Sequence, residues 1–129
     1  MLEAGVTNKK EDIVTIHNSA SAVGSGLLDV YATPSMIALM EGCCHESVAG
    51  FLEEGTGTVG ISLNIRHVAA TPVGMHVYCE SELTQVEGRV LTFQVKAYDE
   101  AGLIGEGTHE RCIVQNEKFQ KKADAKRKA

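Results

Sequence analysis

The sequence contains only two prolines and no segment of low complexity. These absences exclude a proline-rich interdomain linker and a long disordered arm. No apolar run approaches the ~20 residues that cross a bilayer, and the first residues, MLEAGVTNKKEDIV, lack the apolar stretch of a secretory signal peptide. We therefore expect one cytoplasmic domain over residues 1–129, which is long enough to bury a core, and no membrane partner.

Disulfide and metal-ligand patterns are also missing. The four cysteines, Cys43, Cys44, Cys79 and Cys112, include no CxxC pair, and the five histidines show no HxH or HExxH spacing. We expect reduced thiols and no metal site.

Positive charge is scarce except at the C-terminal end. The net charge is −5, although residues 118–129 carry six Lys or Arg against one Asp. The rest of the chain is therefore strongly acidic, which argues against a nucleic-acid partner. We interpret the basic segment 118–129 as a solvated helix end, with contact to a phosphorylated ligand as the alternative.

Periodicity predicts an α+β fold. A short strand is expected at residues 12–17, and a helix at 33–52, because Thr33 is a typical N-cap and Pro34 suits the first helical position. Alternating segments then predict four strands, at residues 59–67, 75–86, 89–98 and 103–114, with a short helix from residue 117. Glu87 and Gly88 are expected to form a tight hairpin link.

One long central helix wrapped by an antiparallel sheet of about five strands is the hotdog arrangement. A single helix leaves an edge strand and part of one sheet face uncovered, so we expect a homodimer whose sheet continues across the interface.

Glu41 is the most informative residue of the predicted helix. At 100° per residue it falls within an apolar stripe formed by Thr33, Ile37, Met40, Cys44, Val48 and Phe51. Burying an unpaired carboxylate is costly, so Glu41 has either a partner or a function. If Glu41 is functional, it is a general base or a nucleophile. If it is structural, its carboxylate reaches solvent at the rim or pairs with a buried cation.

Two of the predicted strands carry further candidates. In the first, one face holds Val59, Ile61, Leu63, Ile65 and His67, and the other holds Gly60, Ser62, Asn64 and Arg66. His67 ends its face beside the loop AATPVG, where a side chain can meet a cleft, although a rim histidine is the plainer alternative. His109 and Arg111 share a face of the last strand, where Arg111 is expected to hold a carboxylate or a ligand oxygen.

The segments TPSMIALMEGCCHESV, TVGISLNIRHVAATPVGM and GTHERCIVQNEKF resemble the fluoroacetyl-CoA thioesterase family of hotdog proteins over about residues 30–119. The spacing of five residues matches that family's active site: Thr33, Glu41, Gly60, His67 and Arg111. The resemblance implies an acyl-CoA thioesterase that needs no cofactor besides its coenzyme A thioester substrate. It also implies a catalytic set of Thr33, Glu41 and His67, with Gly60 beside the acyl group and Arg111 bordering the acyl pocket.

One departure from the family concerns the lid before the helix. The fluoroacetate-specific enzyme has phenylalanine there, whereas this chain reads LLDVYAT. We therefore expect a short acyl-CoA substrate and weak preference for fluoroacetyl-CoA. The alternatives are a non-catalytic acyl-CoA binding or sensing protein and, ranked lower, a hydratase, because the helix lacks a hydratase-like Asp and His pair.

Helix geometry limits how the candidates can meet. Eight helical residues separate Thr33 from Glu41 by ~12 Å of rise, so the two cannot touch within a regular helix. A substrate or another residue lies between them, Thr33 belongs to the lead-in loop, or the site is shared across a dimer.

Overall fold

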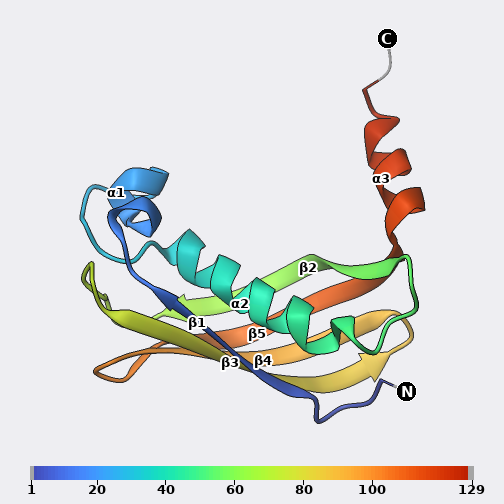
Figure 1. Ribbon diagram of the computed structural model, residues 1–129, viewed down its shortest axis with the longest axis horizontal. Coiled ribbons are helices and arrows are strands. Elements are labelled where there is room, and N and C mark those ends of the chain that lie inside the picture. The colour runs from blue at the N-terminus through green and yellow to red at the C-terminus, as the bar shows by residue number, and fades with distance from the viewer. Residues whose placement is uncertain (1, 128–129) are drawn as a thin grey trace.

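The computed structural model describes residues 2–127 and consists of one antiparallel sheet wrapped around a long helix (Figure 1). The predicted α+β arrangement is confirmed. The elements follow in the order β1 (Thr7–Ile13), η1 (Ile16–Asn18), α1 (Ala20–Val23), α2 (Thr33–Ala49), β2 (Thr56–His67), β3 (His76–Glu87), β4 (Val90–Asp99), β5 (Leu103–Gln115) and α3 (Asn116–Asp124).

The five strands lie in the order β1-β3-β4-β5-β2, and every neighbouring pair is antiparallel. The meander β3-β4-β5 is as predicted, but the hairpin loop between β3 and β4 is Gly88 and Arg89, one residue later than expected. Gly88 has φ 62°, a conformation that primed hairpin turns require and that glycine adopts without strain. Strand β2 is an edge of the sheet.

The leading strand begins five residues earlier than the sequence predicts. It spans Thr7–Ile13, and the chain then turns at a 3₁₀ helix. The reason is a local capping box, in which the Thr15 hydroxyl accepts from the His17 amide and the Asn18 side chain accepts from the Thr15 amide. These side-chain bonds compete with strand pairing.

Helix α2 packs a face on the sheet that differs from the predicted stripe. Its buried residues are Met36, Leu39, Met40, Cys43, Cys44 and Val48. Strand β1 causes the rotation, because it crosses the far flank of the helix, where Asn8 donates to the Cys43 carbonyl and Lys10 pairs with Glu46. Ile37 and Glu41, on the other flank, are only half-buried, and the Glu41 carboxylate lies beside Gly60 of β2. The expectation of a buried Glu41 is therefore wrong.

Strand β2 contains a β-bulge that changes its predicted faces. Gly60 pairs with Arg111, but the register shifts before Ser62, so Ile61 is the extra residue. Leu63 then lies opposite His109, on the side of Arg111 and the helix. Gly60 consequently shares the helix-facing side with Leu63, Ile65 and His67, and the predicted separation of Gly60 from His67 is wrong.

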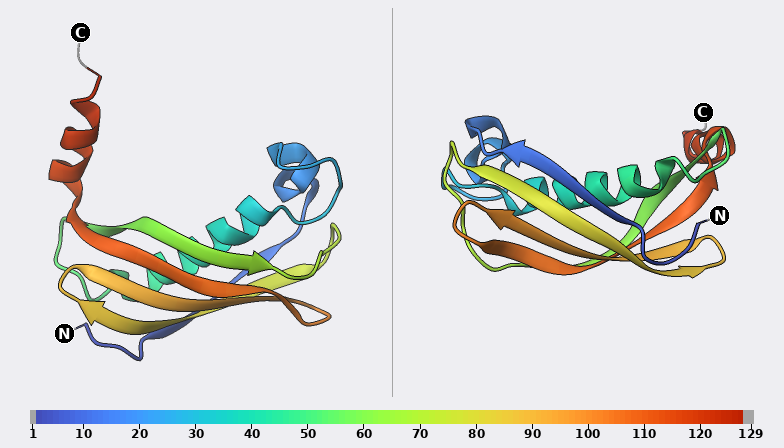
Figure 2. Two further views of the ribbon diagram at one scale, coloured as in Figure 1. Left: turned by 180° about the vertical axis from the view of Figure 1, so that it is seen from behind. Right: turned by 60° about the horizontal axis from the view of Figure 1, so that its bottom comes forward.

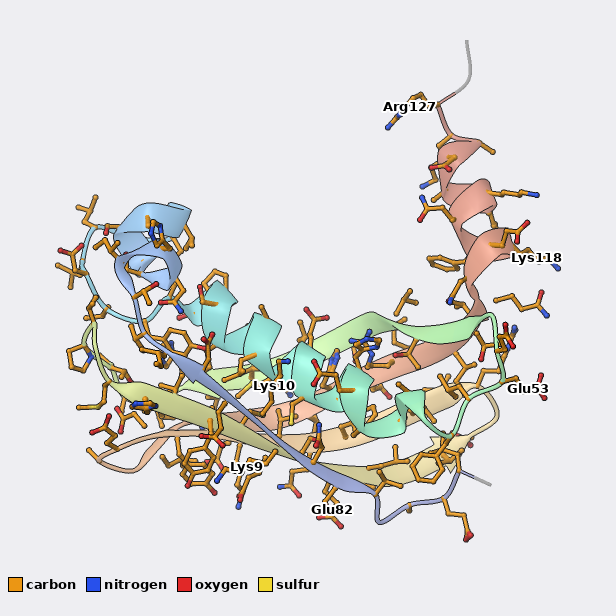
Figure 3. All side chains as sticks on the ribbon, viewed as in Figure 1. Lys9, Lys10, Glu53, Glu82, Lys118 and Arg127 are labelled. Atoms are coloured by element: carbon orange, nitrogen blue, oxygen red, sulfur yellow. The ribbon has the colours of Figure 1, made fainter. Side chains whose placement is uncertain are left out.

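Helix α3 extends from the end of β5 away from the sheet, and the α1 segment rises at the opposite end on the same side (Figures 1 and 2). Lys118 projects from α3, and Arg127 lies beyond the C-terminal end of this helix (Figure 3). Of the basic segment 118–129, Lys128 and Ala129 lie outside the described residues. The flank of α2 and the edge strand β2 lie between these two projections.

Candidate active site

Thr33 and His67 form the first part of the candidate site, at one end of α2. Ala32, not Thr33, is the N-cap of the helix, and Thr33 is its first residue, followed by Pro34. The predicted capping role is therefore wrong, and the Thr33 hydroxyl is free for another partner. Its Oγ1 lies 2.7 Å from His67 Nδ1, which is a strong hydrogen bond.

The His67 ring has an unused nitrogen. Within residues 2–127, its Nε2 is buried without a hydrogen-bond partner. Burial lowers the pKa of His67 below its usual 6.5, so the ring is neutral at pH 7. Burying a ring nitrogen without a hydrogen-bond partner destabilises the fold, so such a nitrogen indicates a candidate functional group.

A pocket of about 310 Å³ adjoins this pair. Its lining comes from the lead-in to the helix, including Val30 and Tyr31, and from the loop after β2, including Val68 and Ala70. Thr33 and His67 both line it, so both side chains can reach a molecule bound there.

Glu41, Gly60 and Arg111 form the second part of the candidate site. The Glu41 carboxylate Oε2 lies 3.7 Å from Arg111 Nη1 and 3.9 Å from His109 Nε2. Its side chain is 38% exposed, so the carboxylate can meet water or a ligand. Arg111, by contrast, is buried and was correctly expected to face a carboxylate.

Gly60 makes room for the carboxylate. A Cβ atom at this position would lie 2.5 Å from Glu41 Oε2 and 3.2 Å from His109 Cε1. Any larger residue would therefore displace Glu41.

His109 was not assigned to the predicted site, although it is fully buried beside Arg111. Its Nδ1 lies 2.8 Å from the Ser62 carbonyl, and its Nε2 lies 3.1 Å from Arg111 Nη1. Burial and, to a smaller extent, the Arg111 charge lower its pKa, while the bond to Ser62 opposes them. The only sequence signal was its i, i+2 spacing to Arg111 on one strand face.

The two parts of the site are separated along the helix. Thr33 and Glu41 both lie within α2, which rules out the expectation that Thr33 belongs to the lead-in loop. The ~12 Å rise between them remains. Thr33 and Glu41 are therefore too far apart to touch each other directly.

Two further properties bear on function. Among residues 2–127 no group of three or more His, Cys, Asp or Glu side chains is placed to hold a metal ion. Over the same residues, no helix is long and apolar enough to span a membrane.

The chain is similar to known thioesterases. The family model described as fluoroacetyl-CoA-specific thioesterase matches residues 14–117. A fluoroacetyl-CoA thioesterase of Streptantibioticus cattleyicolor is 44% identical over 98 residues, which cover 76% of this chain and 70% of that protein.

Solved structures agree with this assignment. The fluoroacetyl-CoA thioesterase FlK superposes with a TM-score of 0.94 at 34% identity, covering 99% of both chains, and it has also been solved as a variant in complex with acetyl-CoA. A thioesterase superfamily member from Thermus thermophilus has a TM-score of 0.87 at 30% identity, over 97% of this chain and 93% of that one. A hot-dog-like protein from Thermanaerovibrio acidaminovorans shares the fold, with a TM-score of 0.88 at 20% identity, over 99% of this chain and 95% of that one. The chain therefore has the hotdog fold and belongs to the fluoroacetyl-CoA-specific thioesterase family.

Proposed function

We propose that this protein hydrolyses a short acyl-CoA to the free acid and coenzyme A, with Thr33, Glu41 and His67 as its catalytic residues. The observation that carries the proposal is the open Glu41 carboxylate, which lies over Gly60 and 3.7 Å from the Arg111 guanidinium. Membership of a thioesterase family supports the same reaction.

The chemistry of a thioester suits these groups. The carbonyl carbon is electrophilic, so hydrolysis needs an oxygen nucleophile, stabilisation of the oxyanion and a proton for the departing thiolate. Glu41 either attacks the carbonyl or removes a proton from the attacking water. His67, with its unpaired Nε2, polarises the carbonyl or donates to the sulfur, and Thr33 orients the ring through the bond to Nδ1.

We further propose that the complete site needs a homodimer. Ile61 and Leu63 are 51% and 44% exposed on β2, whose outer edge has no partner strand. Exposed apolar side chains on an unpaired edge strand favour pairing with another chain. An antiparallel pairing of two β2 edges centred between Leu63 and Asn64 would bring the partner's His67 to Gly60. Each active site would then combine Glu41 of one protomer with the Thr33 and His67 pair of the other.

The cellular compartment and the boundaries of the domain are also proposals. Four free cysteines, of which Cys43, Cys44 and Cys79 are buried, support a reducing, cytoplasmic location. We take residues 1–129 as one thioesterase domain acting on acyl-CoA.

The proposal is tested by measuring free-thiol release from a panel of acyl-CoA thioesters. Glu41→Gln should lower kcat by at least ~10²-fold, the usual size of a general-base contribution, while acyl-CoA binding survives. Glu46→Gln is the matched control, because Glu46 is exposed on the same helix and pairs with Lys10.

The outcome also separates the alternatives. A stable Glu41→Gln protein with near-normal thiol release would contradict the catalytic assignment and move attention to His67 and Thr33. Tight acyl-CoA binding by the wild type without any thiol release would favour the non-catalytic binding protein.

A further inference from the structure

We infer that His109 and Thr58 are positioning residues, which hold the Arg111 guanidinium away from Glu41 and so keep the carboxylate free to react. The inference rests on the proposed function, because it concerns the availability of Glu41. It assigns roles to two residues outside the catalytic set.

The hydrogen bonds of His109 fix its tautomer. The Ser62 carbonyl can only accept, so Nδ1, 2.8 Å away, must carry the hydrogen. The Arg111 guanidinium can only donate, so Nε2, 3.1 Å from Nη1, must accept. Both contacts require the same neutral ring, and its stacking on Phe93 at 6.4 Å adds a third constraint.

Arg111 is held from two sides. Its Nε donates to the Thr58 hydroxyl at 2.8 Å, and its Nη2 donates to the Thr58 carbonyl at 2.9 Å. With Nη1 directed to His109, all three nitrogens have a partner on β2 or β5. The planar fork therefore has little freedom to turn.

The consequence is a gap between Arg111 and Glu41. A charge-assisted bond between guanidinium and carboxylate is about 2.7–2.9 Å long, but Nη1 and Oε2 are 3.7 Å apart. The charged groups that act on His109 are Glu41 on α2 and Arg111 on β5, which lie on its side of the sheet, and Glu110, which lies on the other face of β5. Nη1 carries two hydrogens in the guanidinium plane, and the bond to His109 anchors this end of the group. Without an acceptor at Nε2, this end of the guanidinium would shift toward Glu41 and form a tight ion pair, which makes the carboxylate a weaker base.

Three variants at His109 separate the two bonds. His109→Phe keeps a ring but removes both. His109→Asn keeps an amide near Nδ1 for Ser62, whereas His109→Gln places an acceptor near Nε2 for Arg111. We expect the Phe and Asn variants to lose at least about 10-fold in kcat, with the acid limb of the kcat/KM profile moved to lower pH, and the Gln variant to stay close to the wild type.

Thr58 offers a milder perturbation that preserves the fold. Thr58→Val removes the hydroxyl acceptor and should show a smaller shift of the same limb, while Thr58→Ser should show none. An unmoved acid limb in both His109→Phe and Thr58→Val, or a Gln variant no better than Asn, would overturn the inference.

A second measurement does not depend on turnover. Nitrogen-15 NMR of the wild-type His109 ring should show a protonated Nδ1 and an unprotonated Nε2 at pH 7, and a crystal structure of His109→Phe should show Nη1 within hydrogen-bond distance of Glu41. The opposite tautomer, an imidazolium or an unchanged 3.7 Å separation would refute the positioning role. If the wild type hydrolyses no acyl-CoA, the proposed function fails, but these two results still decide the geometry.

Discussion

Replacing Gly60 by alanine tests the site most directly, because one added atom acts on the Glu41 carboxylate. The new Cβ would lie 2.5 Å from Oε2, whereas ordinary contacts begin near 3.4 Å, so the carboxylate must move by about 0.9 Å. A misplacement of about 1 Å in a catalytic group costs on the order of 10²-fold in rate. We therefore expect kcat/KM of Gly60→Ala to fall by about that factor.

Stability should change far less than activity. Gly60 does not have a positive φ, so alanine brings no backbone strain. The Glu41 side chain is 38% exposed and can swing toward solvent. The cost should lie at the low end of the roughly 1–3 kcal/mol that overpacking usually causes.

The assay is thiol release together with thermal unfolding on one preparation. Gly57→Ala is the control on the same strand, because its Cβ would lie 2.7 Å from Asn116 Oδ1, a flexible amide remote from Glu41. It should keep wild-type turnover. A Gly60→Ala enzyme that is as active as this control would show that the position of the Glu41 carboxylate does not matter for hydrolysis.

Three other outcomes are expected. Leu63→Lys, on the exposed edge of β2, should convert the proposed dimer to a monomer in light scattering and abolish activity; a monomeric wild type at micromolar concentration would contradict this. The pKa values of His67 and His109 are both lowered, chiefly by burial, so the unfolded chain binds protons near pH 6.5 that the folded chain does not. The free energy of unfolding should therefore fall below pH 6.5, by at most about 1.4 kcal/mol per pH unit for each histidine, and equal urea midpoints at pH 7.5 and 5.5 would refute it. Because residues 27–31 contain no phenylalanine, fluoroacetyl-CoA and acetyl-CoA should differ little in kcat/KM, and a preference of several orders of magnitude would show that the lid does not set selectivity.

Much of the fold can be predicted from local signals. The dipeptide Thr33-Pro34 places the start of α2 within a residue, since proline fits only the first helical turn. Period-two alternation places β3, β4 and β5, because side chains of a strand half-covered by a helix must alternate. The family follows from residue types at fixed intervals, and this needs no three-dimensional information.

Local sequence signals could not predict which side chains of β2 face the helix, nor the role of His109. Assigning side chains to alternate faces of β2 assumes regular pairing along the whole strand. The bulge at Ile61 depends on the register with β5, some fifty residues away in the chain. The burial of α2 likewise depends on β1 crossing its far flank.

The sequence by itself therefore determined which residue types the site contains, the helix and strands that carry them, and the family. Only the tertiary structure decided that Gly60 turns toward Glu41, that Arg111 is held between Thr58 and His109, and that Thr33 forms a hydrogen bond with His67. The physical reason is that local pattern and propensity act over a few residues, whereas strand register and helix packing are set by contacts between segments far apart in the chain.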